Sequence, residues 1–276
     1  MARHDMIIRA LAWSEGLFSA RTLRSLAVVA TAVFLLRPQY AAPWISALAG
    51  VLMVLSLWRR DSRAAHLFAF LMSAALITVL MSPLMLWPLH LLLPLGGYGI
   101  LVLAVPSLRG SVTWLKRGAF DSTVWILVVL SAVAGLVGLG AWVALTRPNL
   151  DILVSQFPHV PVWLLPFAGL GFATVNACLE EGVFRGIVQD ALTDEAQASR
   201  SAIVLQAALF GLLHFREGAF PHGVIGVLMT AAYGSLLGLL RHRSGGLAAP
   251  CLAHGLADLV VFMLVGVAAV RGLTTP

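Results

Sequence analysis

The feature that most constrains this chain is a series of long apolar stretches without a charged side chain. No Asp, Glu, Lys or Arg occurs from Ala64 to Leu108, or within 38–58, 122–146, 152–179 and 218–240. A helix needs about 20 apolar residues to cross a bilayer, and these stretches lack the alternating pattern of a membrane barrel. With 60% hydrophobic and 11% charged residues, the chain is predicted to be an all-α, polytopic membrane protein.

Turn signals divide the apolar stretches into individual spans. The longest stretch is broken between Ser82-Pro83 and Trp87-Pro88, which leaves room for two helices joined by a tight turn. We expect about eight transmembrane helices, with a range of seven to nine, because the first and seventh spans are short for a crossing. The expected spans are 25–36, 41–58, 64–82, 88–108, 122–145, 162–189, 201–215, 222–240 and 247–270.

Many basic residues lie between these spans. The net charge is +6, and basic side chains gather at 59–63, 116–117 and 241–243. Because basic loops of this kind set the orientation of membrane proteins, we assign the charge to topology and expect no nucleic-acid partner. The expected location is the inner, cytoplasmic membrane, where the protein is multi-pass and its partners are membrane lipids.

The two halves of the chain differ in their ionisable residues. The spans within residues 1–150 hold almost none, which indicates a scaffold of transmembrane helices. An ionisable side chain inside a bilayer is costly and is by default a sign of function. Residues 151–276 are therefore predicted to form the catalytic core. The ionisable residues at or within its spans are Glu180, Glu181, Arg185, His214, His254 and Asp258.

The first polar motif is Glu-Glu-x-x-x-Arg at residues 180–185. Glu181 and Arg185 are four residues apart, so on a helix they share a face and can pair. Glu180 points about 100° away from Glu181 around the helix axis. We therefore interpret Glu181 and Arg185 as a structural pair, and Glu180 as the free carboxylate that can act as a general base.

Two further motifs carry imidazole groups. Phe-x-x-x-His ends at His214, and a lone histidine on an apolar helix is more often structural than functional. His254 and Asp258 are four residues apart and face the same way on a helix. Two polar helix faces and Glu180 are difficult to satisfy separately in lipid, so we expect them to meet in one wet cavity.

These three motifs, in this order on successive apolar helices, resemble the CPBP family of intramembrane proteases. The family includes the CAAX prenyl endopeptidases and Abi-like bacterial relatives linked to bacteriocin processing or self-immunity. The resemblance covers about residues 160–270. It implies an intramembrane endopeptidase that cleaves a membrane-associated peptide or protein.

The resemblance also implies a role for each motif residue. Glu180 would be the catalytic carboxylate, and with His214 it would position and deprotonate an attacking water. His254 would help to stabilise the oxyanion. Glu181 and Arg185 would mainly hold the site together.

Asp258 departs from the family pattern, because many members carry Asn at this position. An ionised Asp cannot donate a hydrogen bond to an oxyanion as an Asn amide can. Asp258 can instead orient His254, or act in its protonated form in a dry site. It is counted among the catalytic candidates with its role open.

A metal site is the alternative use of the same residues. Glu180, His214, His254 and Asp258 offer the nitrogen and oxygen ligands that zinc accepts, and members of the family have been labelled metalloproteases. The chain has no His-Glu-x-x-His, the spacing that places two zinc ligands on one helix. We therefore expect no cofactor, and keep zinc held by these four residues as the alternative.

Other functions also place ionisable groups inside a membrane. A proton-coupled transporter does so, but here the polar groups gather in one half and no inverted repeat is seen. A non-catalytic immunity protein that kept the motifs is a further alternative. Loss of cleavage with retained biological activity would identify it.

The two cysteines, Cys178 and Cys251, both lie in apolar segments. Cys251 precedes His254 by three residues, which invites a thiol-protease interpretation, but no cation is evident that would activate a thiol. We expect both to be small buried residues.

Overall fold

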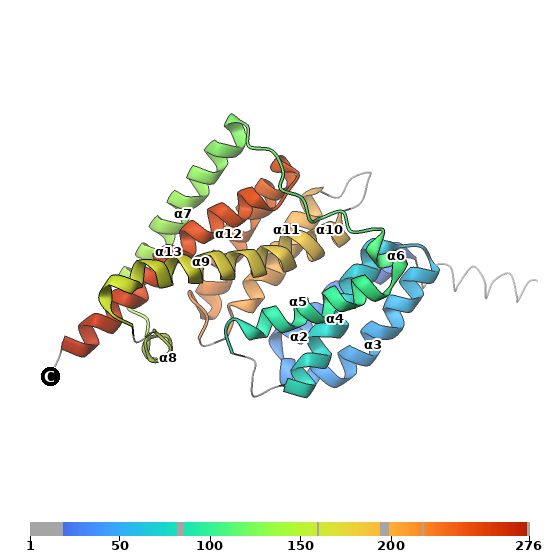
Figure 1. Cartoon of the computed structure of the whole chain (residues 1–276), viewed down its shortest axis with the longest axis horizontal. Helices are drawn as coiled ribbons and strands as arrows, with labels where there is room; N and C mark the ends of the chain where they lie inside the picture. The colour runs from blue at the N-terminus through green and yellow to red at the C-terminus, as the bar shows by residue number, and fades with distance from the viewer. Residues whose placement is uncertain (1–18, 82–85, 159, 194–198, 217, 275–276) are drawn as a thin grey trace, which may run out of the picture. The chain divides into compact units, whose positions relative to one another are not determined.

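The structure is a computed structural model that describes residues 19–81, 86–158, 160–193, 199–216 and 218–274. Every regular element within these residues is helical, and no strand occurs among them (Figure 1). The predicted all-α class is confirmed.

The helices form two compact units, one up to Val112 and one from Thr113 onward. The first contains α2 (Ala20–Leu36), α3 (Pro38–Trp58), α4 (Ser62–Met81), α5 (Leu89–Ala104) and α6 (Pro106–Arg109). The second contains α7 (Ser122–Thr146), α8 (Asp151–Ser155), η2 (Val162–Leu164), α9 (Leu165–Glu181), η3 (Gly182–Val188), α10 (Gln189–Leu192), α11 (Ser199–Leu213), α12 (Gly223–Ser244) and α13 (Ala248–Thr274).

The boundary between the units lies earlier than the division we placed after residue 150. Helix α7 falls in the second unit because it packs against α12 and α13. The assignment of scaffold and catalytic roles to the two parts of the chain stays a prediction.

Six helical segments of the described residues are long and apolar enough to cross a membrane. Three shorter apolar helices, Thr22–Leu36, Leu89–Ala104 and Arg200–Leu213, correspond to the predicted spans at 25–36, 88–108 and 201–215. The chain is therefore a multi-pass membrane protein. The six long segments are Pro38–Trp58, Ser62–Met81, Ser122–Thr146, Val162–Leu192, Gly223–Ser244 and Ala248–Ala269.

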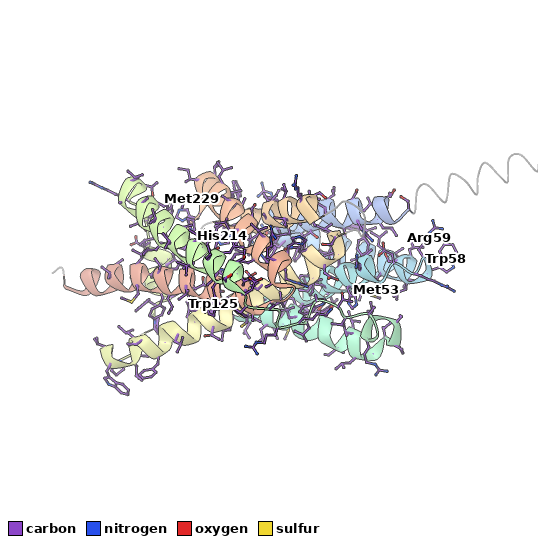
Figure 2. All side chains as sticks on the ribbon, turned by 90° about the horizontal axis from the view of Figure 1, so that it is seen from above. Met53, Trp58, Arg59, Trp125, His214 and Met229 are labelled. Atoms are coloured by element: carbon purple, nitrogen blue, oxygen red, sulfur yellow. The ribbon has the colours of Figure 1, made fainter. Side chains whose placement is uncertain are left out.

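Helix α7 shows how a span divides its surface between protein and lipid. Val124 and Val128 are buried in a cluster with Leu237 and Leu240 of α12. The neighbouring Trp125, labelled in Figure 2, is half exposed and belongs to a run of exposed apolar side chains on the same helix. In water such a face would be a liability, whereas in a bilayer it is the surface that contacts acyl chains.

The predicted span at 88–108 ends earlier than expected. Helix α5 stops at Ala104, and Val105 is extended with φ −104° and ψ 106°. The cause is Pro106, because a residue before proline is disfavoured in the helical region. Part of the turn predicted before this span, residues 82–85, lies outside the described residues.

An extended segment before α7 crosses the turn between α12 and α13. Ala119 N–H donates to the carbonyl of Ser244 at 2.8 Å, and Leu247 N–H donates to the carbonyl of Lys116 at 2.8 Å. Between these bonds Gly246 lies directly against Gly118, so closely that a Cβ on Gly246 would overlap the Gly118 nitrogen. The contact is backbone against backbone, with no flexible side chain that can move aside.

Gly246→Ala is therefore expected to destabilise the second unit by about 1–3 kcal/mol, the usual cost of overpacking. Thermal unfolding of the detergent-purified protein measures the change. Gly140→Ala is the matched control, because no neighbouring atom lies within 4 Å of a Cβ at that position. Equal melting temperatures for the two variants would contradict the close approach at Gly246.

Candidate active site

The predicted pair of Glu181 and Arg185 is formed at the end of α9. Arg185 Nη1 donates to Glu181 Oε1 at 2.8 Å, and both side chains are 0% exposed. Arg185 also donates through Nη2 to the carbonyl of Gly234 on α12 at 3.2 Å. Its guanidinium lies 4.4 Å from the centre of the Phe210 ring on α11. One buried cation therefore links three segments of the unit.

The backbone changes from α-helix to π-helix directly after the two glutamates. Element η3, Gly182–Val188, is π-helical and buried throughout. Such segments are rare and occur frequently at functional sites. Gly186 within it lies against the Trp114 ring, and Gln189 just beyond it donates to the Gly238 carbonyl at 3.0 Å. The sequence pattern predicts a regular helix over 162–189 and carries no signal for this π-helical segment.

His254 on α13 meets all three carboxylates of the motifs. Its Nδ1 is 2.7 Å from Glu181 Oε1, and because a carboxylate can only accept, Nδ1 carries the hydrogen of this bond. Its Nε2 lies 3.6 Å from Glu180 Oε2 and 3.6 Å from Asp258 Oδ1. Glu181 therefore orients the ring, and the other nitrogen faces the remaining two carboxylates.

Asn176 is a member of this cluster that our sequence analysis did not identify. Its Nδ2 donates to Glu180 Oε1 and to Asp258 Oδ2, both at 3.2 Å. The motif suggested that Glu180 has no polar partner on its own helix. The structure differs, because Asn176 lies one turn before Glu180 and bonds it. The spacing of four residues was the available signal, but a search for ionisable groups passes over an amide.

His214 lies directly after the end of α11 and is labelled in Figure 2. Its Nδ1 bonds the carbonyl of Phe210 at 3.1 Å, so in the neutral ring the other nitrogen, Nε2, is the acceptor. The Phe210 ring is 5.0 Å from the His214 ring and 5.7 Å from the His254 ring. No hydrogen bond or ion pair joins His214 to Glu180 in the described part of the chain.

Two buried carboxylate oxygens of this cluster lack a hydrogen-bond partner among the described residues, Oε2 of Glu180 and Oε2 of Glu181. Such atoms are uncommon in proteins. Glu180 Oε2 lies beside His254 Nε2 at a distance too long for a good direct hydrogen bond. A water that bonds both atoms would satisfy them.

The alternative zinc site at Glu180, His214, His254 and Asp258 stays a prediction. Among the described residues, no group of three or more His, Cys, Asp or Glu side chains is arranged to hold a metal ion. We therefore assign no chemical step to a metal.

The cysteines differ from our expectation. Cys178 is exposed and Cys251 is half-buried, so they are not both small core residues. Cys178 is exposed on α9, whereas Asn176, Glu180 and Glu181 on the same helix are buried. Neither thiol takes part in the polar cluster.

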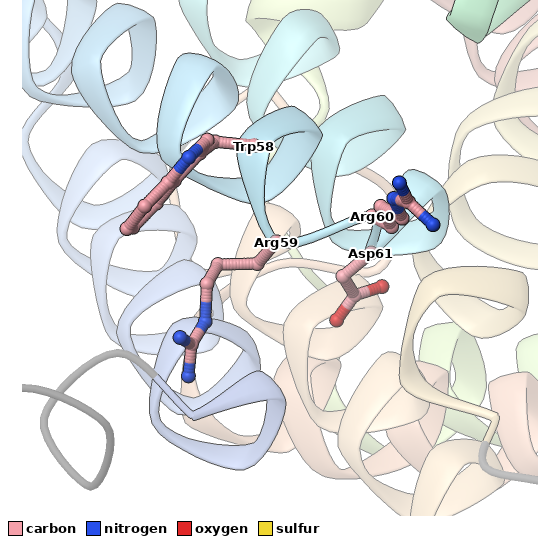
Figure 3. Close-up of a pocket in the computed structure, with 4 residues that line it drawn as sticks. All are labelled: Trp58, Arg59, Arg60 and Asp61. Atoms are coloured by element: carbon pink, nitrogen blue, oxygen red, sulfur yellow. The ribbon is translucent and has the colours of Figure 1, made fainter. Parts of the chain in front are cut away.

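A separate surface pocket lies in the first unit. It is lined by Trp58, Arg59, Arg60 and Asp61, at the turn between α3 and α4 (Figure 3). Arg59 lies 5.9 Å from the Trp58 ring, and Asp61 Oδ2 is 3.4 Å from Arg24 Nε. Exposed tryptophan and arginine at the end of a span are typical of a membrane interface. The pocket shares no residue with the polar cluster.

Comparison with known families identifies the segment that carries the polar cluster. Residues 161–260 match a family described as type II CAAX prenyl endopeptidase Rce1-like. Over this segment the chain is similar to the Rce1-like family. The match includes all six predicted site residues and Asn176. No curated protein and no solved structure was found to match the chain.

The Rce1-like match confirms the predicted family and enzyme class. The class is a CAAX-type intramembrane protease, which hydrolyses peptide bonds. The match covers the segment from η2 to the middle of α13 and leaves the first unit outside. The roles of the individual site residues stay predictions.

Proposed function

We propose that the protein is an intramembrane endopeptidase in which Glu180 activates a water. The observation that carries the proposal is the buried, unpartnered Oε2 of Glu180 beside the Nε2 of His254. A carboxylate within hydrogen-bond reach of a water can act as its general base. The Rce1-like match of the same segment supports peptide-bond hydrolysis as the reaction.

The proposed reaction needs only protein groups and water. The water oxygen bonds the scissile carbonyl carbon while one water proton passes to Glu180. His254, protonated at Nε2, donates a hydrogen bond to the resulting oxyanion, and Glu181 holds the ring through Nδ1. The carbon–nitrogen bond then breaks, and the proton on Glu180 passes to the leaving amine. His214 acts through its Nε2 as a second acceptor for the water.

The substrate class follows from the setting of the site. Its residues lie on helices that cross the membrane, so the substrate is a membrane-associated peptide or protein. The family description names CAAX prenyl endopeptidases, and a CAAX substrate carries a lipid on a cysteine near its C-terminus. We place the protein in the inner, cytoplasmic membrane, with lipids and this substrate as its partners.

Cleavage by the full chain in lipid vesicles tests the proposal. The probes are a fluorogenic library of membrane peptides and a farnesylated peptide that ends in a CAAX sequence. Wild type and Glu180→Gln are compared, each with and without a strong chelator. We expect wild-type cleavage that the chelator leaves unchanged and that Glu180→Gln loses.

Each of the other outcomes points to a different function. Loss of wild-type cleavage on chelation, with recovery on added Zn²⁺, would overturn the metal-free mechanism. Absence of cleavage by both proteins, with proton-coupled flux across the same vesicles, would identify a transporter. Absence of both, with retained biological activity in a Glu180→Ala, His214→Ala variant, would identify a non-catalytic protein.

A further inference from the structure

Asn176 is the one amide that contacts both free carboxylates of the cluster in the described part of the chain. It is 9% exposed and lies on α9, whereas Asp258 lies on α13. Ionised carboxylates can only accept hydrogen bonds. The Asn176 amide therefore turns its NH2 group, rather than its oxygen, toward Glu180 and Asp258. An NH2 group has two hydrogens, which is the number that these two contacts require.

The close approach of α9 and α13 makes this bridge possible. Gly255, the residue after His254, would place a Cβ 3.6 Å from the Ala173 carbonyl and 3.9 Å from the Ala177 side chain. Small residues at a helix contact allow the backbones to approach. At this separation the short side chain of Asn176 reaches a carboxylate on each helix.

The bridge fixes the direction of the two remaining oxygens. Asn176 binds Oε1 of Glu180 and Oδ2 of Asp258, and this leaves Oε2 and Oδ1 for the interior of the cluster. Both of these oxygens lie 3.6 Å from the same atom, His254 Nε2. Rotation of either carboxylate would break its bond to the amide.

We propose that Asn176 is a positioning residue that holds Glu180 and Asp258 as a carboxylate pair beside His254, with Glu180 aimed at the attacking water. The proposal rests on the proposed function, because Glu180 is the base that it positions. Asp258 is then the far anchor of the bridge, and its Oδ1 lies beside His254 Nε2. Its place in the cluster follows from the contact with Asn176 rather than from a bond to the oxyanion.

A double-mutant cycle in vesicles tests this inference with the fluorogenic peptide that the wild type cleaves. The variants are Asn176→Ala, Asp258→Ala and the double variant, with Thr174→Ala on the exposed face of α9 as the control. We expect Asn176→Ala to lower kcat by about 100-fold, the cost of misplacing a reacting group by about 1 Å. The value of KM should stay within about threefold, because Asn176 orients the base rather than the substrate.

Coupling within the cycle separates positioning from a general packing defect. In the Asp258→Ala background the bridge is already lost, so Asn176→Ala should cost less than half as much in log kcat as it costs in the wild type. Asn176→Asp, which keeps the shape but removes both N–H donors, should lose as much as Asn176→Ala. Additive effects, or a rise in KM with unchanged kcat, would overturn the inference.

The result also separates this inference from the proposed function. If Glu180→Gln is inactive and Asn176→Ala cleaves at the wild-type rate, the proposed base stands and the bridge is wrong. If Glu180→Gln cleaves normally, the proposed function fails, whatever Asn176 does. Melting temperatures of all variants identify any that does not fold, and for such a variant Asn176→Ser, which retains one donor, should give intermediate kcat.

Discussion

Glu180→Gln is expected to lower kcat for peptide cleavage by about 10³-fold, within the range that general base catalysis supplies. The substitution keeps the size of the side chain and an oxygen that can accept from Asn176. It removes the ability to take a proton from water, because an amide is not a base at neutral pH. A fold change in kcat with a nearly unchanged melting temperature is therefore the signature to measure.

The control for this variant is Asp151→Asn, which makes the same chemical change at an exposed position of α8. It should leave cleavage within about twofold, since exposed substitutions away from a site have small effects. Glu180→Asp gives a second comparison, because it keeps the base and withdraws it by one methylene. If Glu180→Gln retained the wild-type kcat, another group would have to be the base.

The spans and the Glu181–Arg185 pair could be predicted because each follows from a short-range rule. Charge-free stretches of sufficient length predict transmembrane helices, and a spacing of four predicts a shared helix face. The same spacing gave the common orientation of His254 and Asp258, whose facing atoms are 3.6 Å apart. These predictions need no knowledge of how distant helices pack.

Asn176 and the π-helix could not be predicted in the same way. The bridging role of Asn176 depends on its hydrogen bond to Asp258, which is 82 positions away in the sequence. The two side chains meet only when α13 packs on α9. The π-helical element η3 follows an α-helix without an intervening proline. The packing of Trp114 on Gly186, which accompanies it, is also a long-range contact.

The contacts of His214 could not be predicted from its motif. The motif placed it with Glu180, but the structure gives it a bond to the Phe210 carbonyl and an edge-on contact with the Phe210 ring. The same ring also contacts His254 and supports Arg185. Phe210, the first residue of the Phe-x-x-x-His motif, therefore packs between the side chains of His214, His254 and Arg185. The spacing of the motif does not reveal these contacts.

Arg185→Met is expected to destabilise the second unit by about 3–5 kcal/mol, which is the usual effect of removing one partner of a buried ion pair. Glu181 would remain fully buried without its arginine partner and with only His254 Nδ1 left to bond it, and the Gly234 carbonyl would lose one of its two side-chain donors, Arg185 and Gln206. A loss of this size corresponds to a fall of about 10 °C in melting temperature. Thermal unfolding in detergent measures it.

The double variant Glu181→Gln, Arg185→Met should recover most of this stability, because it leaves no unpaired charge and the new amide oxygen can still accept from His254 Nδ1. Arg216→Met is the control, since Arg216 is exposed and its loss should change stability by less than about 0.5 kcal/mol. A single variant as stable as the wild type would show that the pair is not buried as described. If the double variant were as unstable as Arg185→Met, the contacts of Arg185 with Gly234 and Phe210, rather than its charge, would hold the three segments together.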